Sequence, residues 1–308
     1  MLAVVMFVFA LILLLGGIRN LSGSLKTISG SVFHSLLKNY THRSLQGFSL
    51  GLVATFVLQS SSAVSVIVIG FINGGIFTLR QGLCIIIGAN VGTSLTSQFF
   101  SLELRSILLP IVAAGAFLYV GEKLFKKKLG GSVLLGVSVV LAGIELLSFT
   151  LEPLSSTSFY QEVYLFSRGA PWKGILTGIL TAGMLQSSSV TAGMVVLLAK
   201  ENLLNLPEAL SVIIGADLGT CVTSLLASIG TVLPARQLAF GHVIFNSLSI
   251  LLVLPFWPYF ISLIELTATE PGRLVANAHL LYNLLGALIL LPLVDLYISL
   301  VRKGNIIK

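Results

Sequence analysis

The chemistry that this sequence can offer is concentrated in two copies of one polar motif. Gln-Ser-Ser-Ser occupies residues 59–62 and again residues 186–189, each time inside an apolar stretch. If each motif is the tip of a helical hairpin, its serines can cap the second helix, whose first backbone N–H groups point at the tip. A helix N-terminus surrounded by hydroxyls binds anions without an arginine. Two such tips facing each other predict a site for one small oxyanion, lined by Gln59, Ser60, Ser61, Ser62, Gln186, Ser187, Ser188 and Ser189.

Two glycine-rich segments follow the motifs at the same spacing and have the composition of a cation site. Residues 88–94 read Gly-Ala-Asn-Val-Gly-Thr-Ser, and residues 215–221 read Gly-Ala-Asp-Leu-Gly-Thr-Cys. Two glycines four apart suit a helix that breaks inside a membrane, and a broken helix frees carbonyl oxygens that bind Na⁺. We therefore expect Na⁺ to bind near Asn90, Thr93, Thr96, Ser97, Asp217, Thr220, Thr223 and Ser224. For the motifs and the glycine-rich segments alike, the alternative is that small residues only permit close helix packing.

One position differs in charge between the two glycine-rich segments. Asp217 stands where the first segment has Asn90. A carboxylate in the membrane core is rare and normally functional. Asp217 could bind a cation directly, carry a proton, or be held by neighbouring hydroxyls in a purely structural role.

A shorter repeat has the pattern Ala-x-x-His-x-x-Phe/Tyr-Asn, at residues 239–246 and 276–283. A His and an Asn four residues apart share one helix face. We expect His242 and His279 to form hydrogen bonds across an interface between helices, with contact to substrate or to a proton as the alternative. Two histidines without nearby cysteines or paired carboxylates make a weak metal site.

The motifs and the glycine-rich segments belong to one long repeat. Shifting residues 46–98 by 127 onto residues 173–225 needs no gap, and 18 of the 53 aligned positions are identical. Most of the identities are small or polar residues, so the duplicated feature is a polar site. A duplicated polar site in an apolar chain is typical of secondary transporters.

The composition places the chain among helical membrane proteins. Of its 308 residues, 56% are hydrophobic and 9% are charged, whereas a soluble domain carries about 25% charged residues. We expect one transmembrane domain over residues 1–308, with a first repeat at about 1–128, a second at about 129–256 and an extra helix at 276–301. We attribute the net charge of +7 to cytoplasmic Lys and Arg rather than to nucleic-acid binding.

The apolar segments fall into two matching sets. The first set is a helix at 2–18, a polar stretch at 20–44, the motif segment at 46–72, the glycine-rich segment at 80–100 and a helix at 104–121. The second set is a helix at 131–149, a polar stretch at 150–171, the motif segment at 173–199, the glycine-rich segment at 207–230 and a helix at about 236–256.

The path of each motif segment decides the topology. The arms beside each serine run span roughly 16–20 Å as helix, too short for a hydrocarbon core of about 30 Å. A single helix over residues 46–72 could cross, so length leaves both options open. With both segments as hairpins, 13 of the 18 Lys and Arg residues fall on one side, which the positive-inside rule favours, with the N-terminus outside and the C-terminus inside.

Three crossings in each half then insert the second half upside down. The expected fold is an all-α polytopic membrane protein with two inverted-topology repeats. Each repeat has a re-entrant helical hairpin and a broken transmembrane helix, an architecture that supports alternating access.

The doubled Gln-Ser-Ser-Ser motif and the two Gly-Ala-Asn/Asp-x-Gly-Thr segments resemble the sodium–phosphate cotransporter type II family and its bacterial relatives. The resemblance covers about residues 1–300. It implies Na⁺-coupled movement of inorganic phosphate across the cytoplasmic membrane, with residues 59–62 and 186–189 in the substrate and sodium pathway. By the same resemblance Asn90, Thr93 and Thr220 are nearby candidates. Asp217 departs from the Asn more usual in the family's second repeat, which leaves the number of Na⁺ ions and proton coupling open.

Other functions stay open on sequence alone. One is a proton-coupled or exporting anion transporter of the same fold, and another is a passive anion channel. A hydrolase with a serine nucleophile has the least support, because a triad partner would have to come from His242 or His279. We expect no enzymatic activity, and no cofactor besides Na⁺ as coupling ion. The expected partners are inorganic phosphate, Na⁺ and the lipid bilayer, without nucleic acid, and a homodimer is left open.

Overall fold

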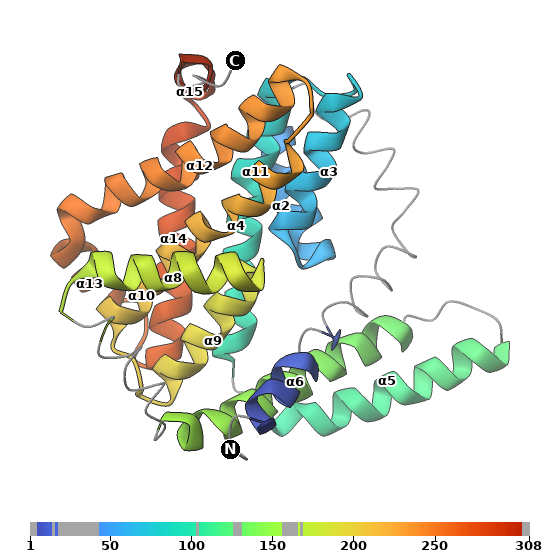
Figure 1. Ribbon diagram of the computed structural model, residues 1–308. Helices are drawn as coiled ribbons and strands as arrows, with labels where there is room; N and C mark the ends of the chain where they lie inside the picture. Colours follow the sequence, from blue (N-terminus) through green and yellow to red (C-terminus); the bar gives the residue numbers. More distant parts are fainter. Residues whose placement is uncertain are drawn as a thin grey trace.

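The computed structural model describes residues 5–13, 16–17, 43–102, 105–125, 131–155, 166 and 169–303, and within these ranges the only regular structure is helical (Figure 1). In the first half, residues 5–13 and 16–17 are helical, within the helix expected at 2–18, and α2 (Ser44–Leu58), α3 (Ser61–Asn73), α4 (Leu79–Ser101) and α5 (Arg105–Phe125) follow. The helices of the second half are α6 (Gly131–Ser155), α8 (Pro171–Leu185), α9 (Ser188–Lys200), α10 (Leu206–Gly219), α11 (Cys221–Ala227) and α12 (Leu233–Val253). The 3-10 helix η1 (Leu254–Phe256), α13 (Trp257–Glu265), α14 (Pro271–Leu290) and α15 (Val294–Lys303) follow. The expected all-α fold is confirmed for the described residues.

Helices α4 and α10 form the centre of the bundle, and α12 and α14 pack against both. Leu83 and Ile87 on α4 and Leu210 and Ile213 on α10 are fully buried. Most residues of both helices, on all sides, are buried. The polar residues that these two helices carry therefore lie in the core rather than on its surface. By contrast, α5 and α6 pack against each other and extend away from this bundle (Figure 1).

Glycines let α2 lie directly against α4, and α8 against α10. A Cβ atom at Gly51 would overlap the backbone carbonyl of Ile85, and one at Gly178 would overlap that of Val212, the equivalent residue of the second repeat. Equivalent close approaches occur at Gly47 and Gly174, Gly88 and Gly215, and Gly92 and Gly219. We call these two helix contacts, α2–α4 and α8–α10, the glycine seams. They show that the sequence repeat is also a repeat of packing.

Each Gln-Ser-Ser-Ser motif ends one helix and starts the next. Gln59 has φ 52° and ψ 29°, and Gln186 has φ 51° and ψ 31°, which is the left-handed region. A residue in this conformation ends a helix, so α3 and α9 begin two residues later, at Ser61 and Ser188. Residues 46–72 are therefore not one continuous helix. Instead α2 contacts α3, and α8 contacts α9, as pairs of short helices.

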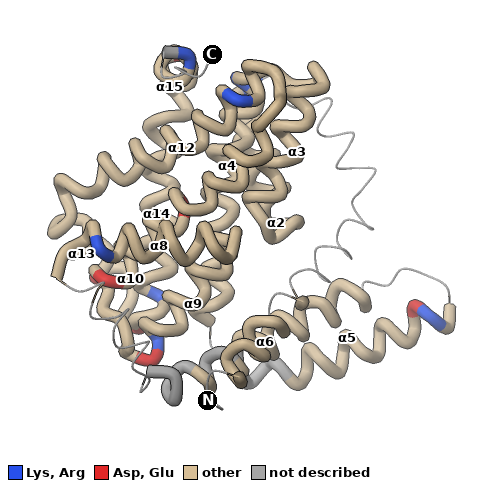
Figure 2. The backbone as a smooth tube through the Cα atoms, viewed as in Figure 1, with Lys and Arg blue, Asp and Glu red and all other residues tan. Residues whose placement is uncertain are grey.

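Four helical spans of the described chain are long and apolar enough to cross a membrane. They are Leu79–Ser101, Leu206–Ala227, Leu233–Glu265 and Pro271–Leu290. Helices α2 and α8 have 15 residues and α3 and α9 have 13, so each is roughly 20–23 Å long, less than the hydrocarbon core of about 30 Å. Figure 2 shows most of the charged residues in the described part near helix ends, with long uncharged stretches between them. These features are consistent with a membrane protein.

The expectation that both glycine-rich helices break is wrong for the first repeat. Helix α4 runs without interruption through Gly88 and Gly92. In the second repeat α10 ends at Gly219, but Thr220 keeps φ −70° and ψ −13°, and its N–H still bonds to the Ala216 carbonyl at 3.1 Å. The glycines form the seams instead, because two backbones can approach closely only where no Cβ intervenes.

The extra C-terminal helix expected at 276–301 is also different. It consists of α14 and α15, separated by a turn that contains Pro292, since proline interrupts a helix. The helix expected at about 236–256 is α12, which ends at Val253, and η1 and α13, which were not expected, continue from its end. The polar stretch at 20–44, except its last two residues, and the lysines at 126–128 lie outside the described residues. The charge count behind the expected sidedness therefore stays a prediction.

Candidate functional site

The two Gln-Ser-Ser-Ser motifs meet in space although 127 residues separate them in the sequence. The hydroxyl of Ser62 on α3 lies 3.5 Å from the backbone carbonyl oxygen of Gln186, which ends α8. Ser61, Ser62, Ser188 and Ser189 are all buried, whereas the Gln186 side chain is exposed. The structure thus brings the two motifs of the predicted anion site together, with the first turn of α3 against the end of α8.

The first serine of each motif caps the helix that follows. Ser60 Oγ accepts a hydrogen bond from the N–H of Ala63 at 3.1 Å. Ser187 Oγ accepts the equivalent bond from the N–H of Val190 at 3.3 Å. A side-chain cap of this kind stabilises a helix by about 1 kcal/mol. Ser60 and Ser187 therefore fix the directions of α3 and α9, as the sequence predicted for the serine runs.

Three other serines of the motifs keep their hydroxyls available. Within the described ranges, the side chains of Ser61, Ser188 and Ser189 make no hydrogen bond to the protein. They lie in the first turns of α3 and α9, where backbone N–H groups lack partners within the helix. Hydroxyls and N–H groups at this place can donate to an anion without breaking an existing hydrogen bond.

His242 on α12 joins the two glycine-rich helices. Its Nε2 lies 3.3 Å from Asn90 Nδ2 on α4, and its Nδ1 lies 2.9 Å from Ser224 Oγ on α11. All three side chains are buried. Because Asn90 belongs to the first repeat and Ser224 to the second, this imidazole bridges the repeats.

His279 on α14 forms a second bridge. Its Nε2 lies 3.1 Å from Asp217 Oδ2 on α10, and its Nδ1 lies 2.7 Å from Ser97 Oγ on α4. Asn283, one turn further along α14, donates from Nδ2 to the same Asp217 oxygen at 2.8 Å. Asp217 is 1% exposed, so these side chains supply its hydrogen bonds in place of water.

The two bridges are equivalent under the 127-residue shift, which relates Asn90 to Asp217 and Ser97 to Ser224. Each histidine places Nε2 at the Asn or Asp position of one repeat and Nδ1 at the serine position of the other. We call His242 and His279 the crossed histidine pair. Both bond to the glycine-rich helices, whereas the sequence pattern had suggested hydrogen bonds between their own helices.

The predicted cation ligands separate into two groups. Asn90, Ser97, Asp217 and Ser224 contact the crossed histidine pair. Thr93, Thr96 and Thr220 donate to carbonyl oxygens of their own helices at 3.2, 3.3 and 3.0 Å, and Thr223 is half-buried. Side-chain bonding to the preceding turn is the usual arrangement for threonine inside a helix, and the oxygen keeps lone pairs that can still face a cation.

Two buried amide oxygens beside Asp217 lack a donor. Asn246 Nδ2 donates to the Asp217 backbone carbonyl at 3.0 Å, and Asn283 Nδ2 donates to the carboxylate. The Oδ1 atoms of Asn246 and Asn283 are buried without a partner in the described part of the chain. Buried acceptors of this kind call for an explanation, and a bound hard cation would satisfy them. Sequence reasoning had not placed these asparagines at the cation site, although their repeated pattern marked them.

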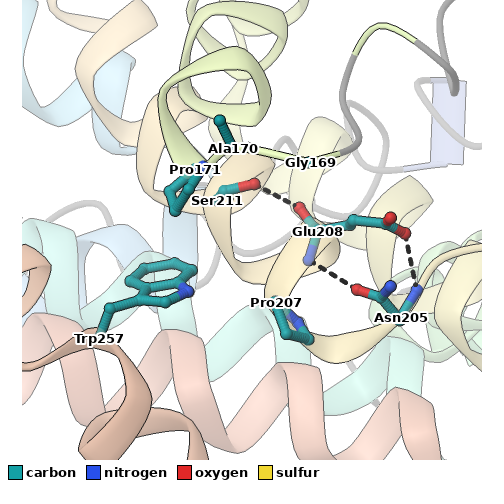
Figure 3. Close-up of a pocket in the computed structure, with 8 residues that line it drawn as sticks. All are labelled: Gly169, Ala170, Pro171, Asn205, Pro207, Glu208, Ser211 and Trp257. Atoms are coloured by element: carbon teal, nitrogen blue, oxygen red, sulfur yellow. Dashed lines mark hydrogen bonds between the residues drawn. The ribbon is translucent and has the colours of Figure 1, made fainter.

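A separate cavity of about 290 Å³ lies where α8 and α10 begin (Figure 3). It is lined by Gly169, Ala170, Pro171, Asn205, Pro207, Glu208, Ser211 and Trp257. Its polar atoms mainly cap α10, because Asn205 Oδ1 accepts from the Glu208 N–H at 2.9 Å and Ser211 Oγ donates to the Glu208 carbonyl at 2.7 Å. The predicted substrate and cation ligands lie elsewhere.

Comparison with known proteins gives consistent results. The model of the Na⁺/Pi-cotransporter family matches residues 13–149 and 151–265. The uncharacterized protein YqeW of Bacillus subtilis is 30% identical over 256 residues, which cover 83% of each chain. YjbB of Salmonella typhimurium, named as a candidate inorganic phosphate export protein, is 25% identical over 256 residues, and the chain spans 47% of its length.

A third relative comes from an animal. Sodium-dependent phosphate transport protein 2A of Mus musculus is 30% identical over 141 residues, which are 41% of this chain and 22% of that protein. No solved structure shows significant similarity to the chain.

Proposed function

The chain belongs to the Na⁺/Pi-cotransporter family, and on that premise we propose that it moves inorganic phosphate across the cytoplasmic membrane, coupled to Na⁺. The observation that carries this proposal is the contact between the two serine motifs, where Ser62 approaches the Gln186 carbonyl. The available hydroxyls of Ser61, Ser188 and Ser189, together with two helix N-termini, would surround one phosphate with hydrogen-bond donors. Gln59 and Gln186 would add amide groups at the rim.

The proposed Na⁺ site lies around Asp217. Its carboxylate and the unpartnered amide oxygens of Asn246 and Asn283 offer the hard oxygen ligands that Na⁺ needs. The other proposed ligands are Asn90, Thr93, Thr96, Ser97, Thr220, Thr223 and Ser224. A cation held here would lower the free energy needed to bring an anion into a region of low dielectric constant. This is the physical reason for coupling the two solutes.

The proposed architecture is one transmembrane domain with two inverted-topology repeats. Helices too short to cross the membrane on either side of each motif support re-entrant hairpins. The matching glycine seams and left-handed glutamines support equivalent repeats. Substrate would be exposed to each side in turn as the repeats move against each other, with the N-terminus outside and the C-terminus inside.

The test is uptake of labelled phosphate by the purified protein in liposomes. We expect uptake to require Na⁺ and to saturate with phosphate. Replacing both Ser61→Ala and Ser188→Ala should reduce uptake to the level of empty liposomes without loss of folded protein. Ser138→Ala is the matched control, because this buried serine bonds only within α6 and should transport normally. Equal uptake in choline buffer would exclude Na⁺ coupling, and currents that do not saturate would indicate a channel.

Export of phosphate is a second candidate, since the name of the YjbB relative refers to export. Transport into inside-out and right-side-out vesicles, each with an inward Na⁺ gradient, separates the two directions. Uptake driven by Na⁺ in right-side-out vesicles supports import. Phosphate movement away from the cytoplasmic face of the membrane, in vesicles of either orientation, supports export.

A further inference from the structure

The two bridging histidines are equivalent in position but not in the atoms that face them. Asn90 Nδ2 donates to the Ile86 carbonyl at 2.9 Å, which fixes the orientation of the amide. The same NH₂ group therefore faces His242 as a donor, so Nε2 of His242 must accept. A neutral imidazole with Nε2 unprotonated carries its proton on Nδ1, and His242 donates that proton to Ser224 Oγ.

His279 is in the opposite situation. Its Nε2 faces Asp217 Oδ2, an acceptor that already receives a hydrogen bond from Asn283. Nε2 must therefore carry a proton, and in the neutral form of the ring Nδ1 accepts the hydroxyl proton of Ser97. Two equivalent rings thus hold opposite tautomers, and the difference follows from one residue, Asn90 in the first repeat against Asp217 in the second.

The tautomers give the two serines opposite roles. Ser97 donates its hydroxyl proton to His279, so its oxygen can offer only lone pairs to any further partner. Ser224 receives a proton from His242, so it keeps its own O–H to donate. Ser97 can then present two lone pairs to a cation, whereas Ser224 has one lone pair left beside its own O–H.

From this geometry we infer that His279 is a positioning residue that couples the two repeats during cation binding, with His242 as its counterpart of opposite polarity. A cation at Asp217 in the second repeat acts through one imidazole ring on the oxygen of Ser97 in the first. Cation binding at the second repeat therefore favours cation binding at the first, and the Na⁺ dependence of transport becomes cooperative. The role given to Na⁺ rests on the proposed function, whereas the tautomers do not depend on it.

The first experiment reads the tautomers directly. Nitrogen-15 NMR of the full chain in lipid nanodiscs, with histidines labelled and assigned through His242→Gln and His279→Gln, should show a proton on Nδ1 of His242 and on Nε2 of His279. Asn90→Asp copies the residue of the second repeat into the first and should protonate Nε2 of His242. Asp295→Asn, which removes an exposed carboxylate in the first turn of α15, is the control and should change neither ring. The same tautomer in both rings would overturn the inference, whatever the transport activity.

The second experiment measures coupling. His279→Gln should lower the Hill coefficient for Na⁺ toward one. Combined with Asp217→Asn, it should raise the half-saturating Na⁺ concentration no more than Asp217→Asn does alone, whereas His242→Gln with Asp217→Asn should be additive. Additive effects for the first pair would overturn the coupling. Opposite tautomers without any Na⁺-stimulated transport would instead reject the proposed function and leave the assignment of the rings intact.

Discussion

A single carboxylate sets the charge of the buried polar centre. Asp217 is held by His279 and Asn283, while the equivalent Asn90 is neutral and bonds to His242. Hydrogen bonds to a charged group contribute about 1.5–3 kcal/mol each, more than those between neutral groups. One repeat can therefore attract a cation more strongly than the other, although the rest of the two networks is alike.

The charge of Asp217 should matter most for Na⁺. For Asp217→Asn we expect the half-saturating Na⁺ concentration of phosphate uptake to rise by about tenfold or more, equivalent to about 1.4 kcal/mol. The maximal rate at saturating Na⁺ should change less. Asp295→Asn removes a carboxylate that is 77% exposed and should leave the Na⁺ dependence unchanged. If both variants behave alike, Asp217 does not bind the cation.

At the residue scale, the sequence predicted local hydrogen bonds well and distant partners poorly. The serine caps at Ser60 and Ser187 follow from local rules that connect a hydroxyl to the third N–H after it. The partners of His242 and His279 lie 18 to 182 residues away. No local rule could show that each ring contacts both repeats, although the repeated His/Asn pattern indicated a shared role.

Among the elements, the helix pairs α2–α4 and α8–α10 are held by backbone contact. At Gly51 and Gly178 the neighbouring atoms are backbone carbonyls of the facing helix. Backbone cannot move aside as a flexible side chain does. A methyl group at either position would therefore push the two helices apart along the whole seam.

Alanine substitution should therefore have opposite effects at the seam glycines and at a glycine outside the seams. Gly51→Ala and Gly178→Ala should each destabilise the protein by about 1–3 kcal/mol through overpacking, seen as a lower midpoint of thermal unfolding in detergent. Gly70→Ala on α3 is the control, because nothing lies within 4 Å of its added Cβ. Alanine there should stabilise the helix by roughly 0.5–1 kcal/mol. Equal effects at Gly51 and Gly70 would mean that the seam is loosely packed.

The glycine spacing also explains why the break predicted in the first glycine-rich helix is absent. Two glycines four apart are compatible both with a broken helix and with close packing, and composition cannot distinguish the two. The continuous α4 shows that packing prevails in the first repeat. At residues 59–60 the helix does end as predicted, because a run of polar residues competes with the helix backbone for hydrogen bonds.

For the whole molecule, the two repeats share features that are far from the motifs. Gly75 after α3 and Asn202 after α9 are equivalent positions, and both have positive φ, at 71° and 57°. The repeat therefore extends through the connection to the next helix. The path of the backbone was predictable from the 127-residue shift, whereas the placement of α5 and α6 outside the bundle was not, because their apolar surfaces carry no sign of what they face.

Inverted repeats would place equivalent connections on opposite sides of the membrane. Gly74 and Glu201 are equivalent, exposed and outside the motifs. In intact cells, a membrane-impermeant thiol reagent should label Glu201→Cys but not Gly74→Cys, and inside-out vesicles should reverse the result. The native Cys84 and Cys221 are buried, so the parent protein gives the background. Labelling of both cysteines from the same side would exclude inverted topology.

The glycine seams also restrict how the molecule can move. Two helices in direct backbone contact should move as one rigid pair, since sliding would carry the carbonyl oxygens that face glycines against residues with side chains. Between the two helix pairs, the described contacts include the hydrogen bonds of two imidazole rings and one long hydrogen bond from a serine to a carbonyl. These contacts can break and reform at a low energetic cost. Conformational change in this protein should therefore be concentrated at the interface between the helix pairs, where the solute would bind. Each pair should keep its internal structure throughout a transport cycle.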